Sequence, residues 1–235
     1  DDYVDANYLE CLYKHNDYAE KTLIIQGLKQ ISNNRIANNI EFAKETLTGK
    51  DVEKAFDGLR IFEHGYTVAK LYNNRMIQQK NIRFDKDISY SEDMLFMMEY
   101  ILGCETIKFV EGSGYNYVVD ASNLSLKYNQ FESEYHLFNK YDKLNNAIAQ
   151  KFSFKPTENS LRNGALILMR SLYSIYINKS KNSKDRLNII KRIRKKKYTY
   201  IKEYYKPQIV LFKVIKLAFT IHPLLFDTIC RIKFR

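Results

Sequence analysis

Several residue types that shape protein architecture are scarce in this sequence. Tryptophan is absent, and only 8 glycines and 3 prolines occur among the 235 residues. So few glycines and prolines exclude the composition that is typical of long disordered linkers. The three cysteines, Cys11, Cys104 and Cys230, are far apart and odd in number, which argues against a closely spaced metal cluster and against a disulfide framework. We interpret them as partly buried small hydrophobes in a reducing compartment.

The sequence also lacks a recognisable N-terminal leader. It begins Asp1-Asp2-Tyr3, with no initiator methionine and no basic segment followed by an apolar one. We therefore expect that processing or truncation has removed residues that preceded Asp1. The chain has 45% apolar and 28% charged residues, which are ordinary values for a soluble globular protein. Its length suits one sizeable domain, alone or with a small extension.

Charge is distributed very unevenly between the two halves of the chain. Residues 151–235 contain 21 Lys and Arg but only 4 Asp and Glu, whereas residues 1–150 contain 17 and 23. The resulting balances of +17 and −6 account for the net charge of +11. Such an asymmetry indicates that the second half faces a polyanionic surface.

The first 128 residues mix strand and helix patterns. The clearest helix covers residues 91–102, where Ser91 suits the N-cap and the apolar residues recur at helical spacing. Ser32–Asn39 is a polar stretch, and residues 82–88 are expected to form a loop anchored by Phe84. Strands are predicted over 22–31, 107–110 and 115–119, the last two on either side of Gly112-Ser113-Gly114, and helical segments over 5–16, 51–61 and 71–80.

Beyond about residue 130 the pattern becomes predominantly helical. Helices are predicted over 132–151, 158–178 and 184–206, followed by an apolar stretch from Ile209. The fold class is therefore α/β in residues 1–128, followed by a mainly α-helical, basic C-terminal extension in residues 129–235.

Two adjacent carboxylates, Glu92 and Asp93, open the clearest predicted helix. Backbone N–H groups and the helix dipole favour negative charge at that position, so acidic residues there are commonly no more than a favourable helix start. The pair alone is weak evidence for function, and its neighbours in the sequence decide its interpretation.

The surrounding residues resemble family 2 glycosyltransferases. Residues 81–96, NIRFDKDISYSEDMLF, resemble the family's stretch I-x-F-x-E-x-x-x-x-x-E-D-x-x-F. Upstream, residues 65–72, GYTVAKLY, resemble its W-x-K-L-Y segment without the tryptophan. Downstream, residues 107–110 and Tyr115-Asn116-Tyr117 resemble the strand and Y-x-Y segment that usually follow.

The first residues of the chain extend this resemblance. DDYV at residues 1–4 and YLE at residues 8–10 resemble the end of D-S-D-D-[YW]-[VI]-x-x-x-Y-L-E. Four segments in the family's order thus span residues 1–128. The resemblance implies a GT-A-type domain represented by its acceptor-side portion, whose nucleotide-binding half would precede Asp1. It also implies that Asp1 ligates a divalent metal and that Asp2 faces the nucleotide-sugar diphosphate.

The chemistry of sugar transfer explains why these residue types are needed. Charge builds on the leaving phosphate, and Mg²⁺ or Mn²⁺ held by carboxylate oxygens offsets it. The acceptor hydroxyl must lose its proton as it attacks, and a carboxylate can take that proton as general base. The resemblance assigns this role to Asp93, with Glu92 in support or in contact with the acceptor. A single displacement would invert the anomeric centre.

Other positions either match or depart from the family pattern. Tyr117 matches the second tyrosine of Y-x-Y and is assigned to the substrate site, but Val118 stands where an arginine often follows. A cation there would have to come from elsewhere, and Lys127 is a candidate. Lys70 matches the lysine of K-L-Y and is either structural or close to the acceptor.

The four histidines are far apart in the sequence and do not form a metal-like group. His64, just before the K-L-Y segment, is the one candidate for the substrate site. For the other three, a surface or satisfied core position is the simpler interpretation; they are His15, His136 and His222.

The C-terminal extension contains a polybasic cluster at residues 191–197 and an apolar stretch at residues 209–219 that includes Lys213 and Lys216. The stretch is too short and too charged to span a bilayer but suits a helix in a membrane interface. Packing on the catalytic domain, with the cluster as a solvated face, is an alternative. Nucleic-acid binding is disfavoured because no recognised fold signature accompanies the basic run.

The sequence therefore predicts an inverting, metal-dependent glycosyltransferase that acts on a nucleotide-sugar donor and a glycan or lipid-linked acceptor, in surface polysaccharide synthesis. Without the nucleotide-binding half, this portion is expected to be inactive alone. We expect it in the cytoplasm, peripheral on the inner face of the cell membrane through residues 191–220. The rival interpretation is a non-enzymatic basic helical module that binds a membrane surface or nucleic acid, with carboxylates that only cap helices.

Overall fold

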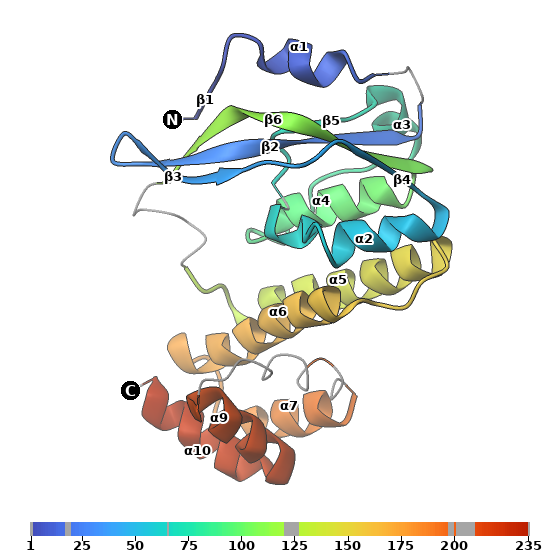
Figure 1. The fold of residues 1–235 in the computed structure, drawn as a ribbon. Helices are drawn as coiled ribbons and strands as arrows, with labels where there is room; N and C mark the ends of the chain where they lie inside the picture. The colour runs from blue at the N-terminus through green and yellow to red at the C-terminus, as the bar shows by residue number, and fades with distance from the viewer. Residues whose placement is uncertain are drawn as a thin grey trace. The chain divides into compact units, whose positions relative to one another are not determined.

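The computed structural model describes residues 2–16, 20–64, 66–119, 127–196, 200 and 210–234 (Figure 1). The chain divides into two compact units. The first, here called the α/β unit, comprises Asp1–Asp85, Ser91–Leu126 and Lys143–Lys155. The second, the helical unit, comprises Lys86–Tyr90, Lys127–Asp142 and Pro156–Arg235. The expected boundary at residue 128 stays a prediction.

A mixed sheet of six strands forms the centre of the α/β unit. Strand order is β1-β6-β2-β3, with β4 paired to β6 and β5 paired to β2. Strands β2 and β6 run parallel, so that Leu23 pairs with Ile107 and Ile25 with Phe109, and all other pairs are antiparallel. The strands are β1 Tyr3–Val4, β2 Thr22–Ser32, β3 Arg35–Ile40, β4 Glu45–Thr48, β5 Lys70–Leu71 and β6 Thr106–Val118.

Helices cover both faces of this sheet. Helix α1 (Tyr8–Tyr13) lies over one face, where Leu12 packs on Ile24 and Val110 (Figure 1). Helices α2 (Glu53–Phe56) and α4 (Glu92–Ile101) lie over the other face (Figure 1). Successive side chains of β2 point to opposite faces of the sheet. Because helices cover both faces, the first seven residues of β2 are all buried.

The strand predicted over 22–31 is confirmed as β2, whereas no strand was predicted in the polar stretch 32–39. It contains β3, which pairs antiparallel with β2 from Leu28↔Ile40 to Ser32↔Arg35. The connecting residues Asn33 and Asn34 have φ of 51° and 57°. Two successive positive φ values are the requirement of a tight hairpin turn, which asparagine tolerates. Nearly all of β3 is exposed, so it has no apolar alternation to detect.

Three further local predictions need correction. The two strands predicted around Gly112 are one continuous strand, β6, because Gly112 adopts φ 97° and a register shift in the β2–β6 pair accommodates it. The helix predicted over 71–80 is strand β5 followed by α3 (Asn74–Gln79). The helical pattern at 51–61 consists of short turns, namely η1 (Gly49–Val52), α2 and η2 (Ile61–His64).

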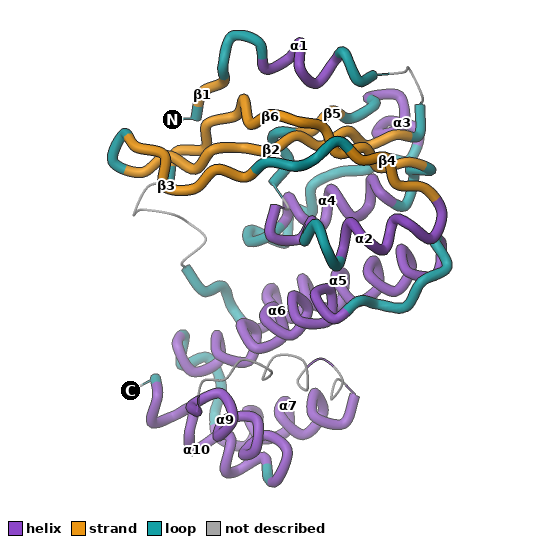
Figure 2. Tube along the Cα trace, in the orientation of Figure 1, coloured by secondary structure: helices purple, strands orange, loops and turns teal. Residues whose placement is uncertain are grey.

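Helices are the regular secondary structure of the described part of the helical unit, and loops connect them (Figure 2). The helices are the first part of α5 (Phe131–Lys151), followed by α6 (Glu158–Ile177), α7 (Ser183–Lys196), α9 (Val210–Ile221) and α10 (Pro223–Lys233). The helices predicted over 132–151 and 158–178 are confirmed as α5 and α6. Residues 201–206 of the third predicted helix lie outside the described residues. Among the described helices, none has the length and apolar character needed to cross a membrane.

Candidate active site

The candidate site begins at the N-terminus of α4. Glu92 and Asp93 are the first two residues of this helix, as predicted from the sequence. Ser91 occupies the N-cap position, but its side chain makes no capping hydrogen bond and its backbone is left-handed, with φ 56° and ψ 22°. Ser91 is therefore the N-cap residue, as predicted, but it does not cap the helix with its side chain, because capping side chains act from an extended backbone.

Asp93 is half-buried, and its surroundings disfavour its charged form. Burial is the largest cause of its raised pKa, and the negative charge of Glu92 adds to it. Two neighbours oppose the shift. Thr67 Oγ1 donates to Asp93 Oδ1 across 3.4 Å, and the positive charge of Lys70 favours the carboxylate. Asp93 thus combines partial access to solvent with a raised proton affinity, which a general base needs.

Lys70 is buried and surrounded by the backbone of the loop that precedes β5. Its ammonium donates to three carbonyl oxygens, those of His64 at 2.8 Å, Tyr66 at 2.5 Å and Val68 at 3.3 Å. Burial lowers the pKa of Lys70 to about 7, and the charge of Asp93 opposes this shift. An ammonium has three N–H donors, so these contacts satisfy all of them. In this structure Lys70 therefore holds the loop in place.

The backbone of this loop is also strained at one residue. Ala69 has φ 55°, in the left-handed region that non-glycine residues enter at a cost. Its carbonyl oxygen nevertheless accepts a hydrogen bond from Gln26 N of β2 at 2.9 Å. The contacts of Lys70 and this link to the sheet together define the path of residues 66–70 beside Asp93.

Two polar atoms near this loop are buried without a hydrogen-bond partner among the described residues. They are His64 Nδ1 and the hydroxyl of Tyr72. The His64 ring lies edge-on to Phe42 at 5.6 Å, and burial lowers its pKa. The Tyr72 ring lies edge-on to Tyr100 at 4.8 Å, and burial raises its pKa, with the charge of Asp93 adding to the rise. Unsatisfied buried polar groups are rare, and they are found where a ligand or water completes the site.

Tyr117 and Asp2 lie near the C-terminal end of β6. The Tyr117 ring packs against Tyr66 with a centroid separation of 5.0 Å, which connects β6 to the Lys70 loop. Asp2 accepts hydrogen bonds from the Tyr115 hydroxyl and from Val118 N, both at 2.8 Å. Asp1, the predicted metal ligand, lies outside the described residues.

The structure thus links four of the described candidate residues, Asp93, Lys70, His64 and Tyr117, through a series of contacts, whereas Asp2 contacts Tyr115 and Val118 instead. Asp93 interacts with Thr67 and Lys70, Lys70 binds the carbonyls of His64 and Tyr66, and Tyr66 packs on Tyr117. Sequence comparison had missed the roles of Thr67, Tyr66 and Tyr72. All three lie in the 65–72 segment that resembles W-x-K-L-Y, so the segment was informative although these positions were not singled out.

Two expectations about cations and metals remain predictions. The carbonyl of Lys127 accepts a hydrogen bond from Arg170, and nothing in the structure tests Lys127 as a substitute for the family's arginine. In the part of the chain that the structure describes, no three His, Cys, Asp or Glu side chains are grouped so as to hold a metal ion.

Comparison with known proteins identifies the fold. No protein-family model and no curated protein matches the sequence. The structure of S. aureus TarS 1-349 in complex with UDP-GlcNAc is similar over 100% of this chain and 65% of that chain, with a TM-score of 0.57 and 16% identity. The complex of the same TarS fragment with UDP gives a TM-score of 0.56 at 14% identity, over 100% and 64% of the two chains.

At these identities the likeness is one of fold. It confirms the predicted class, an α/β domain followed by a helical C-terminal part. The present chain spans slightly less than two thirds of the TarS structures that it matches.

Proposed function

We propose that this chain is part of a glycosyltransferase that moves a sugar from a nucleotide-sugar donor to a glycan or lipid-linked acceptor in surface polysaccharide synthesis. The observation that supports it best is Asp93, a half-buried carboxylate of raised pKa beside the Lys70 loop. The fold is shared with S. aureus TarS, which was solved in complex with UDP-GlcNAc. A GT-A-type domain and membership of family 2 are part of this proposal.

In the proposed reaction Asp93 accepts the proton of the attacking acceptor hydroxyl. Its raised pKa increases its affinity for that proton, while its partial exposure lets the hydroxyl approach. Glu92 strengthens the base by repulsion and is proposed to support it or to contact the acceptor. Attack from the side opposite the leaving phosphate inverts the anomeric centre.

The substrate side of the site is formed by the Lys70 loop and the end of β6. Lys70 positions the loop, and Tyr117 packs on the loop residue Tyr66. The two buried polar atoms of His64 and Tyr72 provide hydrogen-bonding capacity that no described residue uses.

A divalent cation, Mg²⁺ or Mn²⁺, is proposed as cofactor. Mg²⁺ is typically bound by one or two carboxylates together with substrate phosphates, so Asp2 and the adjacent Asp1 fit that requirement. The two hydrogen bonds that Asp2 accepts leave further lone pairs on its carboxylate oxygens. When bound, the cation would offset charge on the leaving diphosphate.

The decisive experiment compares Asp93→Asn with wild type in the full-length protein. Nucleotide release from a panel of nucleotide sugars that includes UDP-GlcNAc is measured with Mg²⁺, with Mn²⁺ and with EDTA. We expect metal-dependent turnover in the wild type and a loss of about 10²–10⁴-fold in Asp93→Asn, the usual contribution of a general base. The matched control is Asp51→Asn, because Asp51 is an exposed carboxylate of the same unit. Unchanged turnover in Asp93→Asn would remove Asp93 as the base, and no turnover of any nucleotide sugar would overturn the enzyme proposal.

We also propose that the chain binds the inner face of the cell membrane through residues 191–220, and that α10 extends this surface. Helix α9 has two apolar faces. Ile215 and Phe219 are buried, and Phe219 packs edge-on against Phe226 of α10 at 5.0 Å. The opposite face of α9 is exposed although it is apolar, with Val214, Leu217 and Ile221. Helix α10 also has exposed apolar residues, namely Leu224, Leu225 and Ile232. An exposed apolar stripe on a strongly basic unit suits an anionic lipid surface.

Sedimentation with liposomes tests the membrane proposal. Leu217→Gln/Ile221→Gln removes two exposed apolar side chains, at 59% and 57% exposure, and leaves the buried face of α9 intact. We expect it to weaken binding to anionic vesicles, whereas the control Leu166→Gln, which changes an exposed leucine of α6, leaves binding unchanged. Equal binding by both variants, or equal binding to neutral and anionic vesicles, would contradict the proposal.

A further inference from the structure

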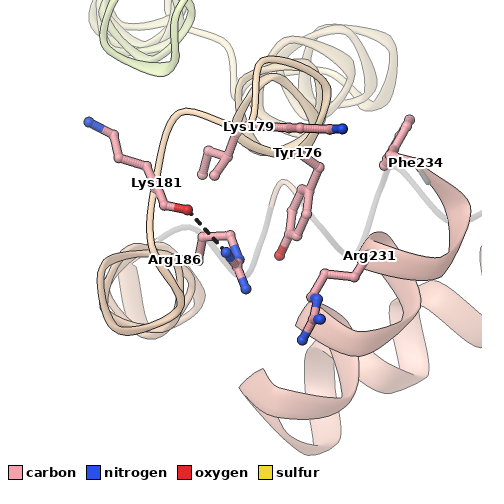
Figure 3. A pocket seen from close by; sticks show the side chains of 7 residues that line it. Tyr176, Lys179, Lys181, Arg186, Arg231 and Phe234 are labelled. Carbon is pink, nitrogen blue, oxygen red and sulfur yellow. Dashed lines mark hydrogen bonds between the residues drawn. The ribbon is translucent and has the colours of Figure 1, made fainter.

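A cavity of about 260 Å³ lies within the helical unit, at α6, α7 and α10. Its lining includes two aromatic residues and four cations, namely Tyr176, Phe234, Lys179, Lys181, Arg186 and Arg231 (Figure 3). The volume is far above the ~15 Å³ that one water molecule needs and slightly below the roughly 300–1,000 Å³ of typical small-molecule pockets. The cavity therefore suits a small group or one end of a larger ligand.

Two of the four cations are already paired with carboxylates. Lys181 forms an ion pair with Glu132 at 2.5 Å, and in Figure 3 its ammonium points away from Tyr176. Arg186 forms an ion pair with Asp227 at 2.7 Å. Within the described residues, Lys179 and Arg231 have no such carboxylate partner.

The cations that face the cavity exceed the acidic groups beside it. Among the described residues, Lys179, Arg186 and Arg231 line the cavity, and Asp227 is the single carboxylate paired with one of them, so two formal positive charges remain. A group with about two negative charges would balance them.

A buried hydrogen-bond network holds one of these cations rigidly. Asp227 is only 5% exposed, and it accepts hydrogen bonds from the Tyr176 hydroxyl at 2.8 Å and from Arg186 Nε at 2.7 Å. Burial acts to raise the pKa of Asp227, but the hydrogen bonds from Arg186 and Tyr176 outweigh it, so the pKa is lowered and the carboxylate stays charged. Arg186 also donates to the carbonyl of Lys181 at 3.0 Å.

The Tyr176 hydroxyl is a polar group of the cavity lining. Figure 3 shows the guanidinium groups of Arg186 and Arg231 on either side of it. Planar guanidinium groups match phosphate oxygens in geometry, and a group that is held in advance loses little entropy on binding. The aromatic rings of Tyr176 and Phe234 form the apolar part of the lining.

We propose that this cavity is a binding site for a phosphate-bearing group, a phosphomonoester or diphosphate that carries about two negative charges. Arg231 and Lys179 supply the charge that the ligand neutralises, and Arg186, positioned by Asp227, completes the binding surface. The site uses no residue of the candidate active site and does not depend on glycosyl transfer. The same chemistry occurs in soluble phosphates and in phosphorylated lipid headgroups, which the experiment separates.

Titration of the full-length protein with inorganic pyrophosphate, followed by calorimetry, tests the proposal. Lys179→Gln/Arg231→Gln removes two exposed charges and leaves the Arg186–Asp227 pair intact, so the fold should persist. The control Lys184→Gln/Lys191→Gln removes the same charge from exposed positions of α7 that do not line the cavity. We expect saturable binding in the wild type, weakened about tenfold or more in the first variant and little changed in the control. No saturable binding in the wild type, or an equal loss in both variants, would overturn the proposal.

Vesicles identify the source of the phosphate. Phosphatidylcholine vesicles with and without phosphatidic acid are compared in the Leu217→Gln/Ile221→Gln background, which removes the contribution of the exposed α9 stripe. A selective gain with phosphatidic acid that Lys179→Gln/Arg231→Gln abolishes would identify a lipid headgroup phosphate. Pyrophosphate binding without that gain would identify a soluble phosphate ligand.

Discussion

Asp93 of the α/β unit and Asp227 of the helical unit are both shielded from water, yet their neighbours shift their pKa values in opposite directions. Asp93 is half-buried, with Glu92 adjacent and only a long hydrogen bond from Thr67, and its pKa is raised. Asp227 is buried as well, but Arg186 and Tyr176 bind it directly, and its pKa is lowered. Burial acts in the same direction at both carboxylates, so the partners decide the difference.

This difference separates a site built for chemistry from one built for stability. A carboxylate whose charge is disfavoured is ready to accept a proton, and a buried lysine such as Lys70, with a pKa of about 7, lies beside it. A carboxylate that is fully paired holds helices together instead. Asp227 of α10 joins Arg186 of α7 to Tyr176 of α6. The predictions below test the two roles, starting with the largest expected effect.

Asp227→Asn should destabilise the helical unit strongly. It removes the charge opposite Arg186 and leaves that guanidinium without its ion pair in a largely buried position, a change that typically costs about 3–5 kcal/mol. The free energy of unfolding, measured by urea denaturation, reports the effect. The exposed control Asp185→Asn should change it by less than about 0.5 kcal/mol. Equal losses in both variants would show that the Arg186–Asp227 pair is not structural.

Acid denaturation provides a second check on Asp227. Because its pKa is lower in the folded than in the unfolded state, its contribution to stability is present above the unfolded value of about 3.9 and is lost as the pH falls through the folded value. The stability of Asp227→Asn should therefore fall less steeply with acid than that of the wild type. Parallel curves would contradict this.

Lys70→Met should destabilise the α/β unit moderately. The methionine keeps most of the buried stem but leaves the carbonyls of His64, Tyr66 and Val68 without their common donor. An unsatisfied buried acceptor costs about 1–3 kcal/mol, but these three contacts are only partly buried and water can replace the donor at some of them, so we expect a loss of about 2–3 kcal/mol in total. Denaturation of Lys50→Met, a change at an exposed lysine of the same unit, is the control. A loss no larger than in Lys50→Met would show that the ammonium does not hold the loop.

The pH dependence of activity should reflect Asp93. A general base must be ionised, so kcat/KM should fall as the pH decreases through the raised pKa of Asp93. The apparent pKa of the acid limb of this profile should therefore lie above the value of about 3.9 that is usual for an aspartate. A limb at or below that value, measured with a saturating metal concentration, would assign the titration to another group.

The smallest effects should come from two neighbours of Asp93 that act in opposite directions. Glu92→Gln removes a charge that raises the pKa of Asp93, so the acid limb should move to lower pH. Thr67→Val removes the hydrogen bond that lowers this pKa, so the limb should move to higher pH. Shifts in the same direction, or none, in the measured profiles would show that these contacts do not set the basicity of Asp93.

Local sequence patterns predicted the elements whose apolar residues form a clear pattern. β2, α4 and α6 were all anticipated, because β2 contains a short run of apolar, mostly β-branched residues and apolar residues recur at helical spacing in α4 and α6. β3 was missed because it is polar and exposed on both faces, and only its hydrogen bonds to β2 make it a strand. The continuity of β6 across Gly112 likewise depends on its parallel neighbour.

In the candidate site, too, some features could be predicted from the sequence and others depend on tertiary contacts. The order of the segments along the chain selected Glu92, Asp93, Lys70, His64, Tyr117 and Asp2, and the structure connects most of these residues through the 64–70 loop. The position of the Lys70 ammonium among three carbonyls could not be predicted, since Ala69 must adopt a positive φ to permit it. Periodicity contains no information on such a backbone conformation.

The amino-acid sequence by itself determined which residue types were available and how charge was divided, with acidic residues in excess before residue 151 and basic residues after it. It determined the local periods and the order of the motifs. Only the tertiary structure decided which charges are paired. Asp93 and Asp227 carry the same chemical group. Each also stands next to an apolar residue of a helix, Met94 after Asp93 and Phe226 before Asp227. Partners that are 41 and 51 residues away, Arg186 and Tyr176, stabilise the charge of Asp227, whereas Asp93 has no partner of comparable strength. Electrostatic environment depends on distance in space, and folding alone sets that distance.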